Sequence, residues 1–125
     1  MMIAFLLMIA AAQAGASPPL PTDWATLPVL RYDRRPDLPA GLDDFVRGEV
    51  ATKRCNPPHG VTSLRVDLAV LVDGGAAVRV VPRAIGCATV EQFAAGLVSR
   101  IARDHLAPAS PDGWYRTMLD LPWQG

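Results

Sequence analysis

The side chains that could carry out nucleophilic or metal chemistry are few in this sequence and do not cluster. Hydrolysis through a serine needs a base and an orienting group, and Ser63, Ser99 and Ser110 lie outside any G-x-S-x-G motif. The two histidines, His59 and His105, are 46 positions apart and have no acidic residues at metal-ligand spacing. The sequence therefore predicts no catalytic site and no metal or cofactor site.

The adjacent carboxylates Asp43 and Asp44 are the one arrangement that resembles an acid–base pair. Negative charge is also favoured in the first turn of a helix, and the helix expected from residue 41 explains both side chains. We therefore predict a protein that is not an enzyme. We expect His59 to be exposed in a Pro-Gly loop and His105 to lie near a helix C-terminus, where a cation is stabilised.

The two cysteines, Cys55 and Cys87, show neither C-x-x-C spacing nor a neighbouring group of histidines. In an exported protein an even number of cysteines indicates a disulfide. We therefore expect a Cys55–Cys87 bond, with a reactive thiol or a metal ligand as the alternative. Closing a loop of about 33 residues would stabilise the fold by about 3–4 kcal/mol.

Residues 1–16 have the features of a signal peptide. An uncharged apolar run ends in Ala12-Gln13-Ala14, which has the A-x-A form of a signal-peptidase site, and Ala14-Gly15-Ala16 is a second such site. The run has about 14 residues, whereas a membrane-spanning helix needs about 20. We therefore predict a periplasmic protein with no stable membrane span after cleavage; the alternative is an uncleaved membrane anchor.

The charge of the chain is balanced, with twelve basic and twelve acidic residues. Such a chain has no overall electrostatic attraction for nucleic acid or for anionic lipid. We therefore expect no nucleic-acid partner.

Residues 17–40 contain six of the twelve prolines. Proline interrupts helices and central strands, so we predict an extended arm with little structure of its own. The remaining residues, 41–125, are expected to form a single α+β domain.

Hydrophobic periodicity predicts the elements of this domain. Apolar residues spaced by three and four indicate a short helix over residues 41–51 and a longer one that Thr89 caps, with Gln92 completing a capping box. The longer helix has an apolar stripe made of Val90, Phe93, Ala94, Leu97 and Ile101. Alternation predicts strands over residues 64–72, 76–83 and 114–123. The expected fold is a small antiparallel sheet, made of a hairpin and the C-terminal strand, with the long helix on one face and a short N-terminal helix.

The register of the hairpin depends on the length of its loop. A two-residue loop at Gly74 and Gly75 would place Val70 opposite Arg79 and bury a charge. We therefore predict a three-residue loop, Gly74 to Ala76. It pairs Val72 with Val78, Val70 with Val80 and Asp67 with Arg83.

The C-terminal strand is expected at an edge of the sheet because Pro122 limits its pairing. Its inward side chains are predicted to be Tyr115, Thr117, Leu119 and Leu121. The opposite face carries Trp114, Arg116 and Met118, and Trp and Arg are enriched in binding hot spots. These three residues are the candidate binding residues.

Three short patterns within residues 66–123 resemble the C-terminal domain of the TonB family of energy transducers. They are the hairpin 70–78 with its Val-Leu-Val-Asp segment, Gly86 followed by Glu91-Gln92 and Ala94-Ala95, and the Leu106-Ala107-Pro108-Ala109 stop. The Tyr-Pro motif usual before the first strand is missing, and a cysteine pair stands in that region.

The resemblance implies protein binding through an exposed sheet edge. The expected partner is a periplasmic or outer-membrane protein, which adds a strand to the edge. The alternative is a small periplasmic enzyme or a ligand-binding module, with its site formed by the arm and the region around Trp114.

Overall fold

The computed structural model describes residues 18–34, 37–52, 54–57 and 60–122. The expected signal peptide and His59 lie outside these ranges. The elements are α1 (Leu42–Ala51), β1 (Ser63–Asp73), β2 (Ala76–Pro82), α2 (Ala88–His105) and β3 (Gly113–Pro122). Their arrangement confirms the predicted α+β fold. Within the described ranges, no helix has the length and apolarity to cross a membrane.

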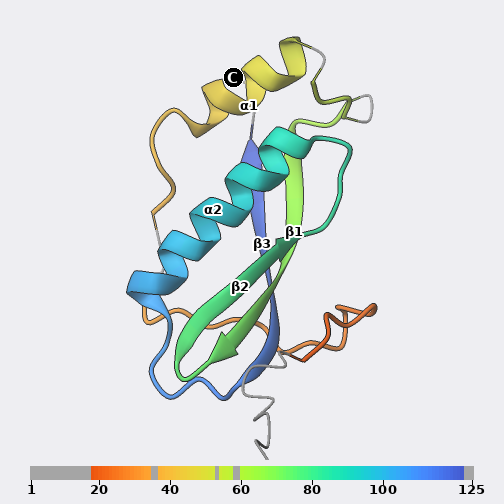
Figure 1. Ribbon diagram of the computed structural model, residues 1–125. Helices are drawn as coiled ribbons and strands as arrows, with labels where there is room; N and C mark the ends of the chain where they lie inside the picture. The colour runs from red at the N-terminus through yellow and green to blue at the C-terminus, as the bar shows by residue number, and fades with distance from the viewer. Residues whose placement is uncertain (1–17, 35–36, 53, 58–59, 123–125) are drawn as a thin grey trace, which may run out of the picture.

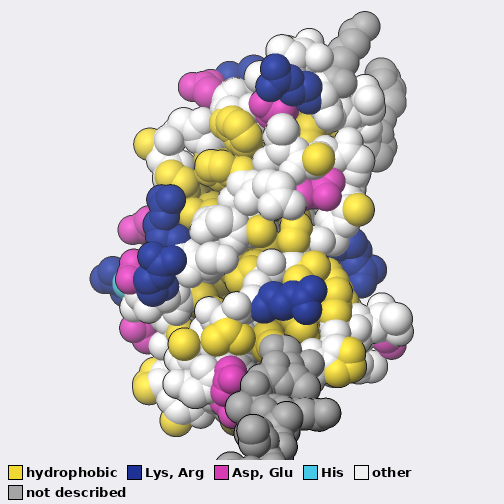
Figure 2. All heavy atoms as spheres, in the orientation of Figure 1, with side chains coloured by type: hydrophobic (Ala, Val, Ile, Leu, Met, Phe, Trp, Pro, Cys, Tyr) yellow, Lys and Arg dark blue, Asp and Glu magenta, His cyan; other side chains and the backbone are white. Residues whose placement is uncertain are grey.

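The three strands form one antiparallel sheet in the order β2-β1-β3. Figure 1 shows α2 lying across one face of the sheet, with α1 near the end of β3. Figure 2 shows charged side chains of both signs spread over this side of the molecule, as the balanced composition predicts. The sheet therefore has an inner face under the helices and an outer face opposite them.

The main core lies between the inner face and the helices. From β1 it contains Leu68 and Val70, from α1 Val46, and from α2 Val90 and Val98, and all five are 0 % exposed. The predicted apolar stripe of α2 is buried at every position except Phe93, which is half-buried. The ring of Phe93 lies 4.8 Å from that of Phe45 on α1, measured between centroids.

The hairpin register is confirmed at Val70, which lies opposite Val80, but the predicted three-residue loop is wrong. Gly74 and Gly75 form a two-residue turn with φ values of 61° and 78°, the left-handed conformation that such turns require. A β-bulge then leaves Val78 without a partner, so that Val72 lies opposite Ala77. The extra residue in β2 shifts the register by one position. Val70 therefore faces Val80 and not the charged Arg79, although the turn has only two residues.

The predicted capping box at the start of α2 is also wrong. The helix begins at Ala88 with Cys87 as its N-cap residue. The Glu91 carboxylate accepts hydrogen bonds from the backbone N–H groups of Cys87 and Ile85 (3.0 and 3.1 Å). The Thr89 hydroxyl instead donates to the buried Glu49 of α1 at 2.7 Å. The hydroxyl that the local pattern assigned to the helix cap therefore binds a residue 40 positions away in the sequence.

The predicted disulfide is present between Cys55 and Cys87, whose Cα atoms are 4.6 Å apart. Both residues are 2 % exposed. The bond joins the segment after α1 to the N-terminus of α2, which Glu91 also stabilises.

The arm forms no helix or strand in its described residues, and backbone hydrogen bonds fix it to the domain. Val29 makes a parallel bridge with Arg116 of β3, and Tyr32 an antiparallel bridge with Leu106 after α2. Figure 1 shows the arm (orange) running past the lower end of the sheet. The described residues of the arm, which include a turn closed by the Leu27 N–H and the Trp24 carbonyl, are therefore packed against the folded domain.

Candidate binding groove on the outer face of the sheet

The outer face of the sheet has an apolar half and a polar half. The apolar half is a second, smaller core made of Ala69, Leu71 and Trp114. Three side chains of the arm, Leu20, Trp24 and Leu27, pack on it. The first half of the arm therefore covers one end of the outer face.

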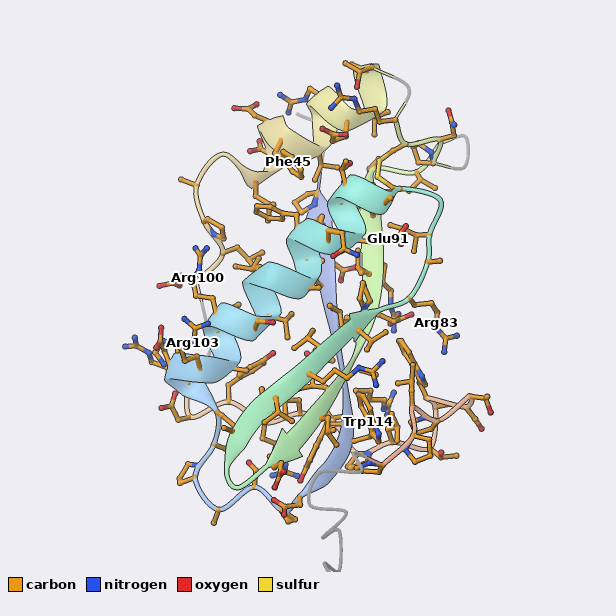
Figure 3. All side chains as sticks on the ribbon, in the orientation of Figure 1. Phe45, Arg83, Glu91, Arg100, Arg103 and Trp114 are labelled. Carbon is orange, nitrogen blue, oxygen red and sulfur yellow. A yellow bond between two sulfur atoms is a disulfide. The ribbon has the colours of Figure 1, made fainter. Side chains whose placement is uncertain are left out.

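Trp114 points to the outer face, as predicted, but the arm covers it. It is 7 % exposed, and its indole N–H donates to the Pro18 carbonyl at 3.0 Å. The guanidinium group of Arg79 lies 5.7 Å from the centroid of its ring. Figure 3 shows Trp114 at the lower end of the sheet, beside the arm. In this structure Trp114 holds the arm in place.

The polar half of the outer face is open and forms a groove of about 540 Å³ between the sheet and the arm. Its floor comes from β1 and β3 and from Arg83, the residue that follows β2. Its lining includes Trp24, Arg65, Asp67, Arg83, Arg116 and Met118. The groove thus contains two of the three candidate binding residues, Arg116 and Met118.

Three arginines face the groove, and two of them have no carboxylate partner in the part of the chain that the structure describes. Arg65 forms an ion pair with Asp67 at 3.2 Å. The guanidinium group of Arg83 lies over the Trp24 ring, 4.4 Å from its centroid. The Nε of Arg116 donates to the Leu27 carbonyl at 2.9 Å. Among the described residues no carboxylate lies within ion-pair distance of Arg83 or Arg116, so the groove carries excess positive charge.

The predicted opposition of Asp67 and Arg83 is confirmed for the backbone. The N–H of Arg83 donates to the Asp67 carbonyl at 2.8 Å. The side chains have other partners, because Asp67 pairs with Arg65 and Arg83 stacks on Trp24. The cross-strand prediction did not take account of the arm, whose Trp24 contacts Arg83.

The β3 edge of the sheet is partly occupied by the arm and partly open. The N–H of Arg116 donates to the Pro28 carbonyl at 2.9 Å, and its carbonyl accepts from the Leu30 N–H at 2.8 Å. Because successive backbone groups of a strand point to opposite sides, Met118 and Asp120 also direct their N–H and C=O groups away from β1. No described backbone group pairs with them. Met118 is 45 % exposed.

The β2 edge is less suited to pairing. Val78 lies in the bulge, and Pro82 has no N–H. Bulges and prolines are features that protect edge strands from adding another strand. Of the two edges, the stretch of β3 at Met118 and Asp120 is the better template for a partner strand.

A phenol lies where the arm crosses β3. The Tyr32 Oη and Thr117 Oγ1 atoms are 3.3 Å apart and share a hydrogen bond. Burial raises the pKa of Tyr32 above its ordinary value of 10.0, and the hydrogen bond to Thr117 acts in the opposite direction. Tyr32 is therefore neutral when it anchors the arm at neutral pH.

The residues considered for acid–base chemistry lie apart from one another. His105 contacts Asp33 (3.3 Å) and Arg34 (3.2 Å), where α2 ends against the arm. Asp43 and Asp44 pair with Arg47 on the surface of α1. The hydroxyls of Ser99 and Ser110 donate to nearby backbone carbonyls. In the described ranges no three His, Cys, Asp or Glu residues form a group that could hold a metal ion.

Sequence reasoning did not assign Trp24, Arg65 or Arg83 to a site. One signal was available: residues 68–72 are apolar without interruption. Such a run indicates a strand buried on both faces, and the second face needs a cover. The arm, with Leu20, Trp24 and Leu27, is the segment that provides it.

Neither family models, curated proteins nor solved structures give a match to this chain. The resemblance of residues 66–123 to TonB C-terminal domains stays a prediction.

Proposed function

We propose that this chain is an exported, periplasmic domain that binds a partner protein by pairing an extended segment of the partner with the β3 edge. The observation that carries the proposal is the pair of outward-facing backbone positions at Met118 and Asp120, beside an open groove. Strand addition of this kind gives affinity through main-chain hydrogen bonds.

The arm supports this mode of binding. It already pairs with β3 at Arg116 in parallel orientation, through two backbone hydrogen bonds. The chain then leaves the edge toward Leu106, where Tyr32 makes its bridge. An incoming segment would continue along β3 from the point at which the arm departs. The TonB-like pattern of residues 66–123 implies the same use of a sheet edge.

A small-molecule site is the second candidate. The groove volume of about 540 Å³ falls in the range of about 300–1,000 Å³ that ligand pockets occupy. A periplasmic ligand-binding module would use the groove without the β3 edge. In both candidate functions Trp114 contributes indirectly, because it holds the arm that forms one wall of the groove.

A titration followed by NMR separates the two candidates. The probe is a capped peptide of alternating threonine and valine, and its control is the same peptide with alternate backbone nitrogens methylated. We expect the first peptide to shift the amide signals of Met118 and Asp120 and to slow their hydrogen exchange, and the control to do neither. Equal effects of both peptides, or none at these amides, would contradict edge pairing.

A second copy of the chain is the competing occupant of the edge. Sedimentation of the protein alone tests this, because strand pairing between copies would produce a dimer. A dimer that the Met118→Pro substitution dissociates would overturn the proposal of a partner protein.

A further inference from the structure

We propose that the partner segment carries a carboxylate side chain, which Arg83 and Arg116 bind in the groove. This inference rests on the proposed function, since it assumes that the segment pairs with the β3 edge. It adds the chemistry by which the segment is recognised.

The charges of the groove favour an acidic ligand. The groove presents Arg65, Arg83 and Arg116 against Asp67 and Asp23. The Asp67 carboxylate is engaged by Arg65, and the Asp23 carboxylate accepts the N–H of Ala25 at 3.0 Å. Both acids thus have partners, while Arg83 and Arg116 have no carboxylate partner among the described residues.

The sheet register places the two cations on either side of one site. Asp67 of β1 lies opposite Met118 of β3 and pairs by its backbone with Arg83, at the end of β2. Arg116 lies opposite Ala69, two residues along the strands and on the same face of the sheet. One strand separates the two arginines laterally and two residues separate them along the strands, so their backbones are about 12 Å apart. Both side chains line the same groove.

Both guanidinium groups are held before a ligand arrives. Arg83 is stacked on Trp24, and Arg116 uses its Nε on the Leu27 carbonyl. The terminal nitrogens of each group are left to bind an anion, and a guanidinium fork matches the two oxygens of a carboxylate. Prior ordering lowers the entropic cost of binding.

The position of the carboxylate in the segment follows from the pairing. A partner residue directly opposite Met118 on the outer face is a diagonal neighbour of Arg116, at about 7–8 Å, within reach of a long side chain. The other diagonal neighbour is Asp120, which lies opposite Arg65 in the register of β1 and β3. A glutamate opposite Met118 would lean toward Arg116 and away from Asp120. The backbone of Arg83 is three strand spacings from that residue, about 14 Å, so its guanidinium group reaches the carboxylate with both side chains extended across the groove.

The test compares two capped threonine–valine peptides that differ at one central position, glutamate in one and glutamine in the other. At low salt we expect the glutamate peptide to bind about five- to tenfold more tightly, because each exposed ion pair adds a small increment. Added salt should reduce this preference by screening. The dissociation constants are measured by calorimetry.

Variants assign the preference to the groove. Arg83→Gln and Arg116→Gln should each reduce the preference for glutamate, measured as the ratio of the dissociation constants of the two peptides for the same variant. Arg100→Gln is the matched control, since Arg100 is exposed on α2, on the other side of the molecule from Arg83 in Figure 3. It should retain the full preference.

The outcomes separate this inference from the proposed function. Equal affinity for the two peptides, or a preference that survives in the Arg83→Gln/Arg116→Gln double variant, would overturn the inference and leave edge pairing intact. Failure of both peptides to bind would overturn the two together.

Discussion

The guanidinium group of Arg83 lies over the indole ring of Trp24, 4.4 Å from the ring centroid. This contact joins the end of β2 to the arm. On one side of it the arm closes the apolar half of the outer face over Trp114, and on the other side the polar groove stays open. A single contact therefore contributes to both the stability of the arm and the shape of the groove.

The arm should contribute to the stability of the whole domain. Leu27→Ala removes a side chain that packs on the second core, so we expect it to lower the free energy of unfolding by about 1–2 kcal/mol. The matched control is Leu38→Ala, because Leu38 is 43 % exposed and its loss should cost less than about 0.5 kcal/mol. Denaturant unfolding measures both. Equal effects would mean that the arm does not stabilise the domain.

The arm also shows where sequence reasoning reached its limit. The α2 stripe and the strand alternation were predictable because each pattern is local and repeats over several residues. The prolines of the arm led us to expect neither helix nor strand there, and its described residues form neither, but proline content does not report tertiary packing. Leu20, Trp24 and Leu27 meet Trp114 only after folding.

Two smaller errors have similar causes. The bulge at Val78 has no distinctive sequence signal. Its extra residue permits the two-residue turn at Gly74 and Gly75, which we had excluded because it would place Arg79 opposite Val70. Thr89 has the pattern of a cap, but its hydroxyl binds Glu49, 40 positions away. Competition from distant partners cannot be predicted from a window of the sequence. The same holds for Arg83 and Trp24, which define the groove.

The disulfide should stabilise the protein without taking part in chemistry. Reduction of the Cys55–Cys87 bond should lower the free energy of unfolding by about 3–4 kcal/mol, as expected for the loop that it closes. Denaturant midpoints of the oxidised and reduced protein test this value. An unchanged midpoint, or two free thiols in the native protein, would contradict it.

Leu97 is a buried residue of α2 that should contribute to stability. It is 7 % exposed and lines a pocket with Phe45 and Phe93, beside the segment before α1. We expect Leu97→Ala to cost about 2–5 kcal/mol. Gln92→Ala, at an exposed position of the same helix, is the control and should change stability by less than about 0.5 kcal/mol. A comparable loss in both variants would argue against a buried role for Leu97.

Tyr32 should make stability sensitive to alkaline pH. Burial raises the pKa of this phenol in the folded protein, so the unfolded chain releases the proton first, near pH 10. Below that pH both states are protonated and the contribution of Tyr32 is fully present. As pH rises from about 9 to about 11, unfolding becomes more favourable. The free energy of unfolding should therefore fall more steeply in wild type than in Tyr32→Phe, and parallel pH profiles would contradict this.

Export is tested by the mass of the protein recovered from periplasmic extract. We expect a species that begins after Ala14 or Ala16, since both positions end a small-residue signal-peptidase site. A membrane-bound species that retains Met1 would favour the uncleaved anchor instead.

The central claim is that the β3 edge pairs with an extended segment through its backbone. Met118→Pro removes an N–H that points away from β1, so the ladder between β1 and β3 keeps its hydrogen bonds. Met118→Val shortens the side chain and keeps the N–H. The direct measurement is the affinity of each folded variant for the capped threonine–valine peptide. The proposal predicts a loss of about tenfold or more for Met118→Pro and near wild-type binding for Met118→Val. Equal affinities of the two variants would contradict it.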